Sequence, residues 1–162
     1  MKWVMMVIFL IAVSFQAHQT VLNFELQEAD HHRVLDGIQL ASQDALLAVT
    51  TDSQTQGNPE FDQTIAIQAF QNTLAANLSL DPTTLQPFPN TLLSATPTIQ
   101  SQQFYDASTT SFPDSLVVYG MTMTLNQPTI LFNVQVAIPS YNSGEPAVAI
   151  TVPVIQSYQS VS

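Results

Sequence analysis

The sequence predicts an α+β protein with a long N-terminal α-helix, a second helix and a three- to four-stranded antiparallel β-sheet. Three observations support this fold class. Residues 3–13 form an unbroken apolar run, apolar residues then recur at helical spacing to about residue 50, and beyond Pro97 they alternate with a period of two. We expect an N-terminal helix over residues 1–50 and an extracytoplasmic α+β globular domain over residues 51–162.

The first predicted element is a hydrophobic segment that we expect to lie in a membrane. Lys2 precedes it, and the side chains expected in apolar surroundings are Trp3, Val4, Val7, Ile8, Leu10, Ile11 and Phe15. The apolar run is shorter than the roughly 20 residues of a spanning helix and close to the h-region of a signal peptide. Ala12-Val13-Ser14 would then supply the small residues of a cleavage site. Alternatively, the helix continues through Val21 and Leu22 and reaches spanning length, which we favour because no Pro or Gly break follows the run.

An amphipathic extension continues this helix to about Thr50. The predicted packing face consists of Leu22, Leu26, Val34, Ile38, Ala41, Ala45 and Val49, spaced mostly by three or four residues. Gly37 is a mild liability that costs about 1 kcal/mol relative to alanine in a helix. At 1.5 Å per residue the whole helix would be about 65 to 70 Å long.

The composition of residues 50–59 indicates a linker, after which Asn58 and Pro59 predict the N-cap and first turn of a second helix. This helix should end near Leu78, before Asp81-Pro82. The residues expected to be buried in it are Phe61, Ile65, Phe70, Leu74 and Leu78. A proline-rich extended loop should follow to about Pro97, held to the domain by Leu85, Phe88, Leu92 and Leu93.

The last third of the chain predicts strands. Apolar residues alternate over 117–125 and over 130–138, and Asn126-Gln127-Pro128 is a short turn between them, so we expect a hairpin. A further strand should run over 147–158, after a turn at 143–146. Pro153 predicts an edge position for it because proline cannot donate to a ladder. A weaker strand is predicted over 98–105.

Charge and composition limit the classes of function. The chain has two basic and twelve acidic residues, a net charge of −10 and no cysteine. Such a surface repels phosphate backbones, so we exclude nucleic acid as a partner. Lys2 at the N-terminal end fits the positive-inside rule. A hydrophobic content of 46% argues against disorder.

Few residues in the sequence point to a catalytic or metal-binding activity. Glu28, His32 and Asp36 follow at four-residue steps and can bind a divalent metal weakly, but a solvated helix face is the simpler interpretation. Arg33 lies three residues from Asp30 and Asp36, which predicts either a local surface pair or an ion pair with a neighbouring subunit. We expect no catalytic residues, no cofactor-binding residues and no metal site, and therefore no enzyme.

The hydrophobic segment, its amphipathic extension and the alanine-spaced stretch from Asp36 to Ala48 resemble type IV pilin-like and pseudopilin subunits. The stretch looks like the one that follows the membrane segment in minor pilins of tight-adherence (Tad, TadE-like) systems. The resemblance covers the first third of the chain. It implies helices that pack in a filament core or wait in the membrane, with globular parts facing outward. The family's glutamate near the start of the apolar run is missing here, which favours a minor or divergent subunit.

From these observations we expect a structural subunit or assembly component of a cell-surface filament or secretion apparatus. Its expected partners are the lipid bilayer and copies of itself or other pilin-like subunits. Its expected location is the cell membrane, with an extracytoplasmic domain, or an extracellular filament. Two alternatives remain open: an extracellular binding or adhesion domain, either released from a signal peptide or membrane-anchored, and a virion structural protein.

Overall fold

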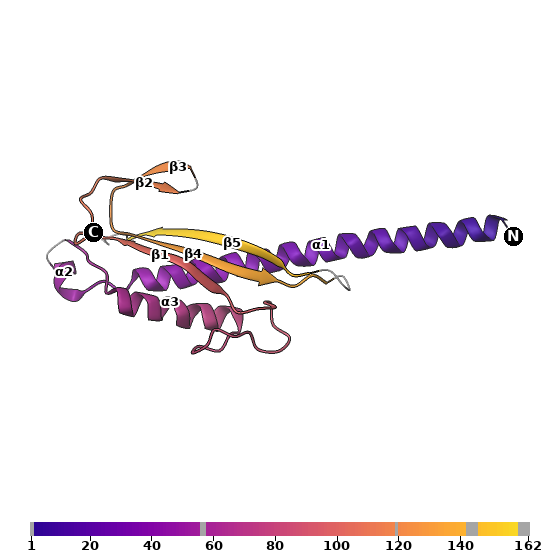
Figure 1. The fold of residues 1–162 in the computed structure, drawn as a ribbon, viewed down its shortest axis with the longest axis horizontal. Helices are drawn as coiled ribbons and strands as arrows, with labels where there is room; N and C mark the ends of the chain where they lie inside the picture. The colour runs from indigo at the N-terminus through magenta and orange to yellow at the C-terminus, as the bar shows by residue number, and fades with distance from the viewer. Residues whose placement is uncertain (1, 56–57, 119, 142–145, 159–162) are drawn as a thin grey trace.

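The computed structural model describes residues 2–55, 58–118, 120–141 and 146–158. In chain order the elements are α1 (Lys2–Leu46), α2 (Thr51–Thr55), α3 (Gln63–Leu78), β1 (Thr98–Tyr105), β2 (Asp114–Val118), β3 (Met121–Leu125), β4 (Thr129–Ile138) and β5 (Val148–Ser157). The predicted α+β class is confirmed. Figure 1 shows a long rod, α1, with a small head of helices and strands around its C-terminal half.

Helix α1 is one unbroken element of 45 residues, about 68 Å at 1.5 Å per residue. It ends a few residues earlier than predicted because Val49 forms a β-bridge with Phe61. The Thr50 N–H also donates to the Glu60 carbonyl at 2.9 Å. The predicted linker contains the short helix α2.

Helix α3 begins later than the sequence indicated. Its N-cap is Asp62, whose carboxylate accepts a hydrogen bond from the Ile65 N–H at 3.0 Å. The predicted cap at Asn58 was wrong because the residues after it, up to Phe61, extend toward the end of α1 before the helix starts. The helix ends at Ser79 in the left-handed region, with φ 54°.

The main sheet has the order β1-β4-β5, with all pairs antiparallel. Strand β5 lies at an edge, as Pro153 predicted, and the weaker predicted strand at 98–105 is β1. The predicted hairpin between 117–125 and 130–138 was wrong. Residues 114–125 instead fold on themselves as β2 and β3, with Val118 paired to Met121, and Gly120 between them has φ +78°. Tyr119 and most of the predicted turn at 143–146 lie outside the described residues.

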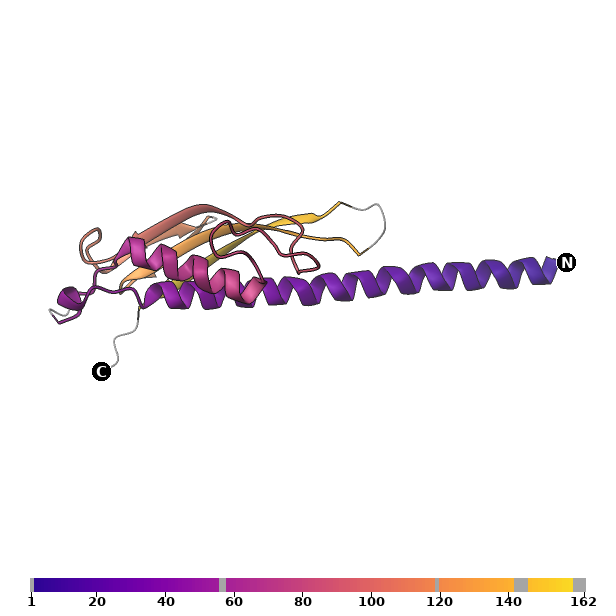
Figure 2. The ribbon, with the colours of Figure 1, turned by 90° about the horizontal axis from the view of Figure 1, so that it is seen from below.

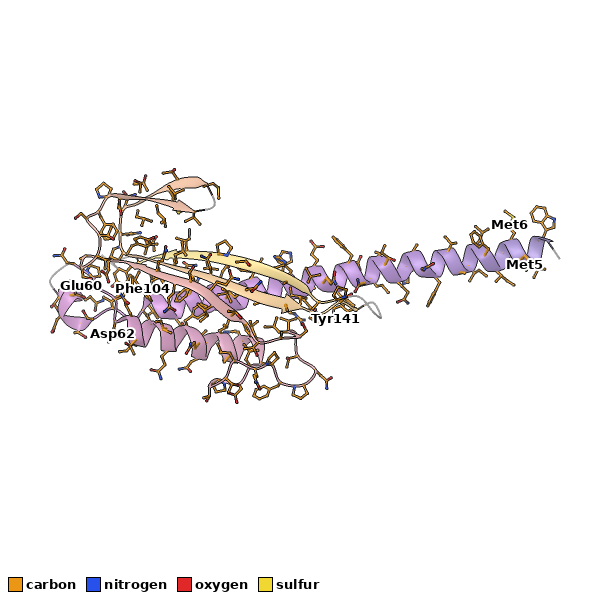
Figure 3. All side chains as sticks on the ribbon, in the orientation of Figure 1. Met5, Met6, Glu60, Asp62, Phe104 and Tyr141 are labelled. Atoms are coloured by element: carbon orange, nitrogen blue, oxygen red, sulfur yellow. The ribbon has the colours of Figure 1, made fainter. Side chains whose placement is uncertain are left out.

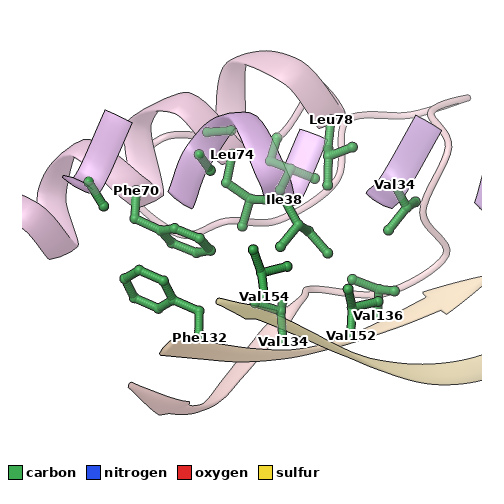
Figure 4. Packing of buried hydrophobic residues seen from close by; sticks show 14 of the residues in the cluster. Val34, Ile38, Phe70, Leu74, Leu78, Phe132, Val134, Val136, Val152 and Val154 are labelled. Atoms are coloured by element: carbon green, nitrogen blue, oxygen red, sulfur yellow. The ribbon is translucent and has the colours of Figure 1, made fainter. Parts of the chain in front are cut away.

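The core fills the space between the helices and one face of the sheet, which α1 and α3 cover (Figures 2 and 4). Phe70 of α3 and Phe132 of β4 stack at its centre, with ring centroids 4.1 Å apart and 19° between ring planes. The fully or almost fully buried apolar residues around them are Val34, Ile38, Ala41, Ala45, Ala66, Leu74, Leu78, Ile130, Val134 and Val136.

In α3 and the loop that follows it, two residues predicted to be buried are exposed. Ile65 is 55% exposed because it lies one position away from the buried face of α3, on which Ala66, Phe70 and Leu74 follow at four-residue steps. Phe88 is 50% exposed, whereas Leu80 and Leu93 in the same loop are 3% and 4% exposed and belong to the core. Leu85 and Leu92 are partly buried against the core.

Asp106 fixes the end of β1 to the segment that precedes α3. Its carboxylate accepts hydrogen bonds from the Phe61 N–H at 3.0 Å and the Ser108 hydroxyl at 2.6 Å. Burial alone would raise the pKa of Asp106, but the hydrogen bonds from Ser108, Phe61 and Thr109 together lower it below its ordinary value. The ionised side chain is therefore part of the folded structure.

The Phe70–Phe132 stack predicts that Phe132→Ala strongly destabilises the folded chain. Removing a fully buried ring from a packed core should lower the free energy of unfolding by about 3 to 5 kcal/mol. The matched control, Ile65→Ala, truncates an exposed side chain and should change this free energy by less than about 0.5 kcal/mol. Chemical unfolding of the full chain in a non-ionic detergent measures both, and equal losses would contradict the described core.

The Asp106 contacts predict a pH-dependent contribution to stability. Because its pKa is lower in the folded chain, the contribution is complete above the ordinary aspartate pKa and is lost as pH falls through the folded value. Asp106→Asn should lower the free energy of unfolding by about 1 to 3 kcal/mol at pH 7 and by less at low pH. Asp36→Asn, at an exposed helical position, is the control. Unfolding curves between pH 2 and 7 measure the effect, and a pH-independent loss would contradict it.

Candidate membrane and assembly site

The N-terminal half of α1 projects from the head, and every side chain from Trp3 to Leu22 is exposed. We call residues 3–22 the projecting segment. Figure 3 shows Met5 and Met6 near its free end, far from the labelled residues of the head. Its side chains include all those expected in apolar surroundings, namely Trp3, Val4, Val7, Ile8, Leu10, Ile11 and Phe15, each at least 52% exposed.

The dimensions of the projecting segment match a bilayer. Twenty helical residues span about 30 Å, the thickness of a hydrocarbon core. Among the described residues, α1 is the one helix long and apolar enough to cross a membrane. Its polar interruptions lie toward the head, and the Thr20 hydroxyl donates to the Gln16 carbonyl at 3.0 Å. This hydroxyl is therefore satisfied within the helix, as apolar surroundings require.

A tyrosine fastens the head to α1 just beyond the projecting segment. The Tyr141 N–H donates to the Asn23 side-chain oxygen at 2.9 Å, and the Tyr141 hydroxyl donates to an Asp30 carboxylate oxygen. Asn23 is 9% exposed and Asp30 is 6% exposed. We call these three residues the Tyr141 clasp. It marks the point where α1 leaves the head (Figure 3).

The contacts of the clasp change the pKa of Tyr141. The hydrogen bond to Asp30 raises the pKa of the Tyr141 phenol, and burial and the negative charge of Asp30 raise it further, while Arg33 opposes them. The neutral phenol is thus favoured in the folded chain. Neutral Tyr141 can donate to the carboxylate, whereas its anion would repel it.

The residues of the predicted packing face divide between two sides of the helix. Val34, Ile38, Ala41 and Ala45 are fully buried in the core. Leu22 and Leu26 are instead 38% and 47% exposed, and Val49 lies beyond the end of α1. The buried face continues toward the N-terminus through Asp30 and Asn23. The apolar pattern of the sequence did not single out these polar residues, although their spacings of four and eleven residues from Val34 place them on its face.

Arg33 is exposed beside a groove of about 410 Å³, whose other lining residues include Asp36, Leu40, Asn77 and Asn90. Within the described residues it forms no hydrogen bond or ion pair. Asp30, one of its two predicted local partners, faces the head and binds Tyr141. The guanidinium group therefore remains available to another molecule.

The histidines lie elsewhere. His31 and His32 line a separate groove of about 430 Å³ between α1 and the sheet, together with Phe24, Glu28 and Ile150. Asp36 lines the Arg33 groove instead, so the three candidate metal ligands at 28, 32 and 36 do not line one pocket. No group of three His, Cys, Asp or Glu residues in the described part of the chain could hold a metal ion.

A long apolar N-terminal helix followed by a small antiparallel sheet is compatible with a pilin-like α+β fold. Comparison of the chain with known protein families, curated proteins and solved structures found no match. The family resemblance therefore rests on the sequence of the first third of the chain and on this architecture.

The Tyr141 clasp predicts a local effect of Tyr141→Phe. Losing the phenolic donor leaves the Asp30 carboxylate without that partner and should cost about 1 kcal/mol, observed as faster hydrogen exchange in residues 23–30. Because the folded pKa is raised, the wild-type contribution is present below the ordinary tyrosine pKa and is lost as pH rises through the folded value. The two proteins should therefore converge at high pH. Tyr105→Phe, on β1, is the control, and equal exchange in wild type and Tyr141→Phe at pH 7 would refute the clasp.

Proposed function

We propose that this chain is a pilin-like structural subunit or assembly component of a cell-surface filament or secretion apparatus, anchored by α1. One observation carries the proposal. A single unbroken helix has an apolar, wholly exposed N-terminal half and a C-terminal half that forms part of the core of the head. The helix thus joins an apolar environment to a folded polar head as one rigid body.

The exposed apolar surface requires surroundings other than water. Removing apolar surface from water gains about 25 cal/mol per Å², so twenty exposed and mostly apolar residues favour either a bilayer or other helices. Both surroundings are apolar, and a segment stored in lipid can therefore move into a helical bundle at little cost. This property suits a subunit that waits in a membrane and is then assembled.

The charge distribution supports an orientation. Lys2 directly precedes the segment, and all twelve acidic residues follow it. A positive end on the cytoplasmic side and an acidic head on the other side follow the positive-inside rule. The proposed location is therefore the cell membrane with an extracytoplasmic head, or an extracellular filament.

The decisive experiment is the intact mass of the native protein, combined with electron microscopy of the same cell-surface fraction. A mass that retains residues 3–15, in material containing filaments labelled by an antibody to the head, supports the proposal. A mass beginning near Phe15, in soluble monomeric material, would indicate a released binding domain. Labelling of virus particles would indicate a virion protein.

Anchoring by the projecting segment predicts a loss of membrane retention in the double variant Ile8→Asp/Ile11→Asp. Each charge near the centre of a membrane helix costs about 2.5 to 3.5 kcal/mol. Purified wild-type protein reconstituted into vesicles should float with the lipid after an alkaline wash. Most of the double variant should be released, whereas Gln39→Asp/Gln43→Asp, with the same added charge on an exposed face beside the head, should float like wild type. Retention of the Ile8/Ile11 variant would contradict anchoring.

A further inference from the structure

The end of the head nearest the projecting segment exposes several apolar side chains. Phe24 of α1 is 66% exposed, and Tyr141 and Val148, at the end of the sheet, are 50% and 49% exposed. Pro146 and Ala147 are exposed beside them. We call these five residues the end patch, and Figure 3 shows Tyr141 at this end of the head. Apolar side chains that gather at one place, unlike single scattered ones, mark an interaction surface.

The Tyr141 clasp fixes the level of the end patch along α1. The Tyr141 N–H donates to the Asn23 side-chain oxygen at 2.9 Å, and Asn23 comes directly after the projecting segment. When residues 3–22 fill the hydrocarbon core of a bilayer, the end of the sheet therefore lies close to the point where α1 leaves that core. The headgroup layer beyond it is about 5 to 7 Å thick. The end of the sheet and the first turn after the projecting segment consequently meet the headgroups.

Charge and aromatic residues mark the same level. Glu25, the first acidic residue of the chain, is exposed directly after Phe24. A carboxylate is costly in hydrocarbon, so Glu25 opposes any deeper entry of α1 into the core. Trp3 marks the opposite boundary, since it is 79% exposed and precedes Asn23 by 20 residues, about 30 Å along the helix. Aromatic side chains at both ends of an apolar span are typical of helices that cross a membrane.

The groove of about 430 Å³ beside Phe24 combines apolar and polar side chains. Val148 lies on its sheet side, and Gln27, Glu28 and His32 are among the polar residues on its α1 side. The boundary between headgroups and acyl chains offers both kinds of partner, so this mixed lining fits it. The exposed Glu28 and the net charge of −10 repel anionic lipids, which favours a zwitterionic phospholipid surface.

We propose that the head itself rests on the bilayer through the end patch, which contacts the headgroups of zwitterionic phospholipids. This contact is separate from the anchoring helix but rests on the proposed function, because the projecting segment brings the head to the membrane surface. Since α1 continues into the core of the head as one helix, the contact sets the orientation of the whole head. The β2–β3 hairpin, at the other end of the head in Figure 1, then faces away from the membrane.

Tryptophan fluorescence measures the depth of the end patch, because Trp3 is the one tryptophan of the chain. In a Trp3→Phe background, Ala147→Trp reports on the end patch, and Val117→Trp, at an exposed position of β2, is the control. Full-length chains are reconstituted into phosphatidylcholine vesicles that contain lipid with a nitroxide on the headgroup. This quencher should lower the fluorescence of Ala147→Trp at least two-fold and leave that of Val117→Trp nearly unchanged. Acrylamide, which quenches from the water, should act at least two-fold more strongly on Val117→Trp.

Two further proteins make each outcome decisive. Val148→Trp in the same background should behave like Ala147→Trp and keeps the test valid where one variant does not fold. If the nitroxide lipid quenches neither, the headgroup contact is overturned, and shielding from acrylamide in that case would show that a protein covers the end patch instead. Trp3 of the otherwise unchanged chain tests the anchoring, because its fluorescence should also fall in nitroxide vesicles. Unquenched Trp3 would overturn the proposed function itself, whereas quenched Trp3 with an unquenched end patch overturns the head contact alone.

Discussion

The packing of the C-terminal half of α1 against α3 and the inner face of the sheet determines the rest of the structure. Val34, Ile38, Ala41 and Ala45 are fully buried there, and β4 supplies the apolar residues opposite them. Since these four residues belong to the same continuous helix as the projecting segment, the orientation of the head relative to the rod is fixed by core packing. No hinge is needed between them.

Small residues make this packing close. A Cβ atom at Gly37 would lie 2.9 Å from a methyl carbon of Leu78, so α1 and α3 approach each other more closely than alanine would allow without a shift of Leu78. The glycine that lowers the intrinsic stability of the helix thus has a packing role. Ala41 and Ala45 continue the small-residue side of the interface.

Most of the fold could be predicted because apolar residues recur with a clear helical or strand period over long stretches of the sequence. The helical period identified α1, alternation identified β4 and β5, and Pro153 indicated the edge. The alternating pattern did not reveal that residues 114–125 contain two strands, because β2 and β3 have nearly the same alternation as one long strand would have. Partner choice among strands depends on tertiary packing, which a period of two does not record.

The projecting segment was similarly visible in the sequence, but the Tyr141 clasp was not. The clasp joins residues that are 118 and 111 positions apart in the sequence. A tyrosine just beyond the end of a strand has no local sequence pattern that indicates its hydrogen-bond partners. The division of the predicted packing face was also hidden. Leu26 and Val34 both fit a helical repeat, and the position of the sheet decides which of them is covered.

The clasp has a mechanical consequence. A pull on the rod directed away from the head is transmitted along α1, and Asn23 and Asp30 are the first described points at which the rod is tied to the end of β4 through Tyr141. Beyond them, β4 and β5 run roughly alongside α1 (Figure 1), so further load acts in shear over the whole core rather than peeling one strand at a time. Such a pull therefore loads the two hydrogen bonds of the clasp before it loads the core.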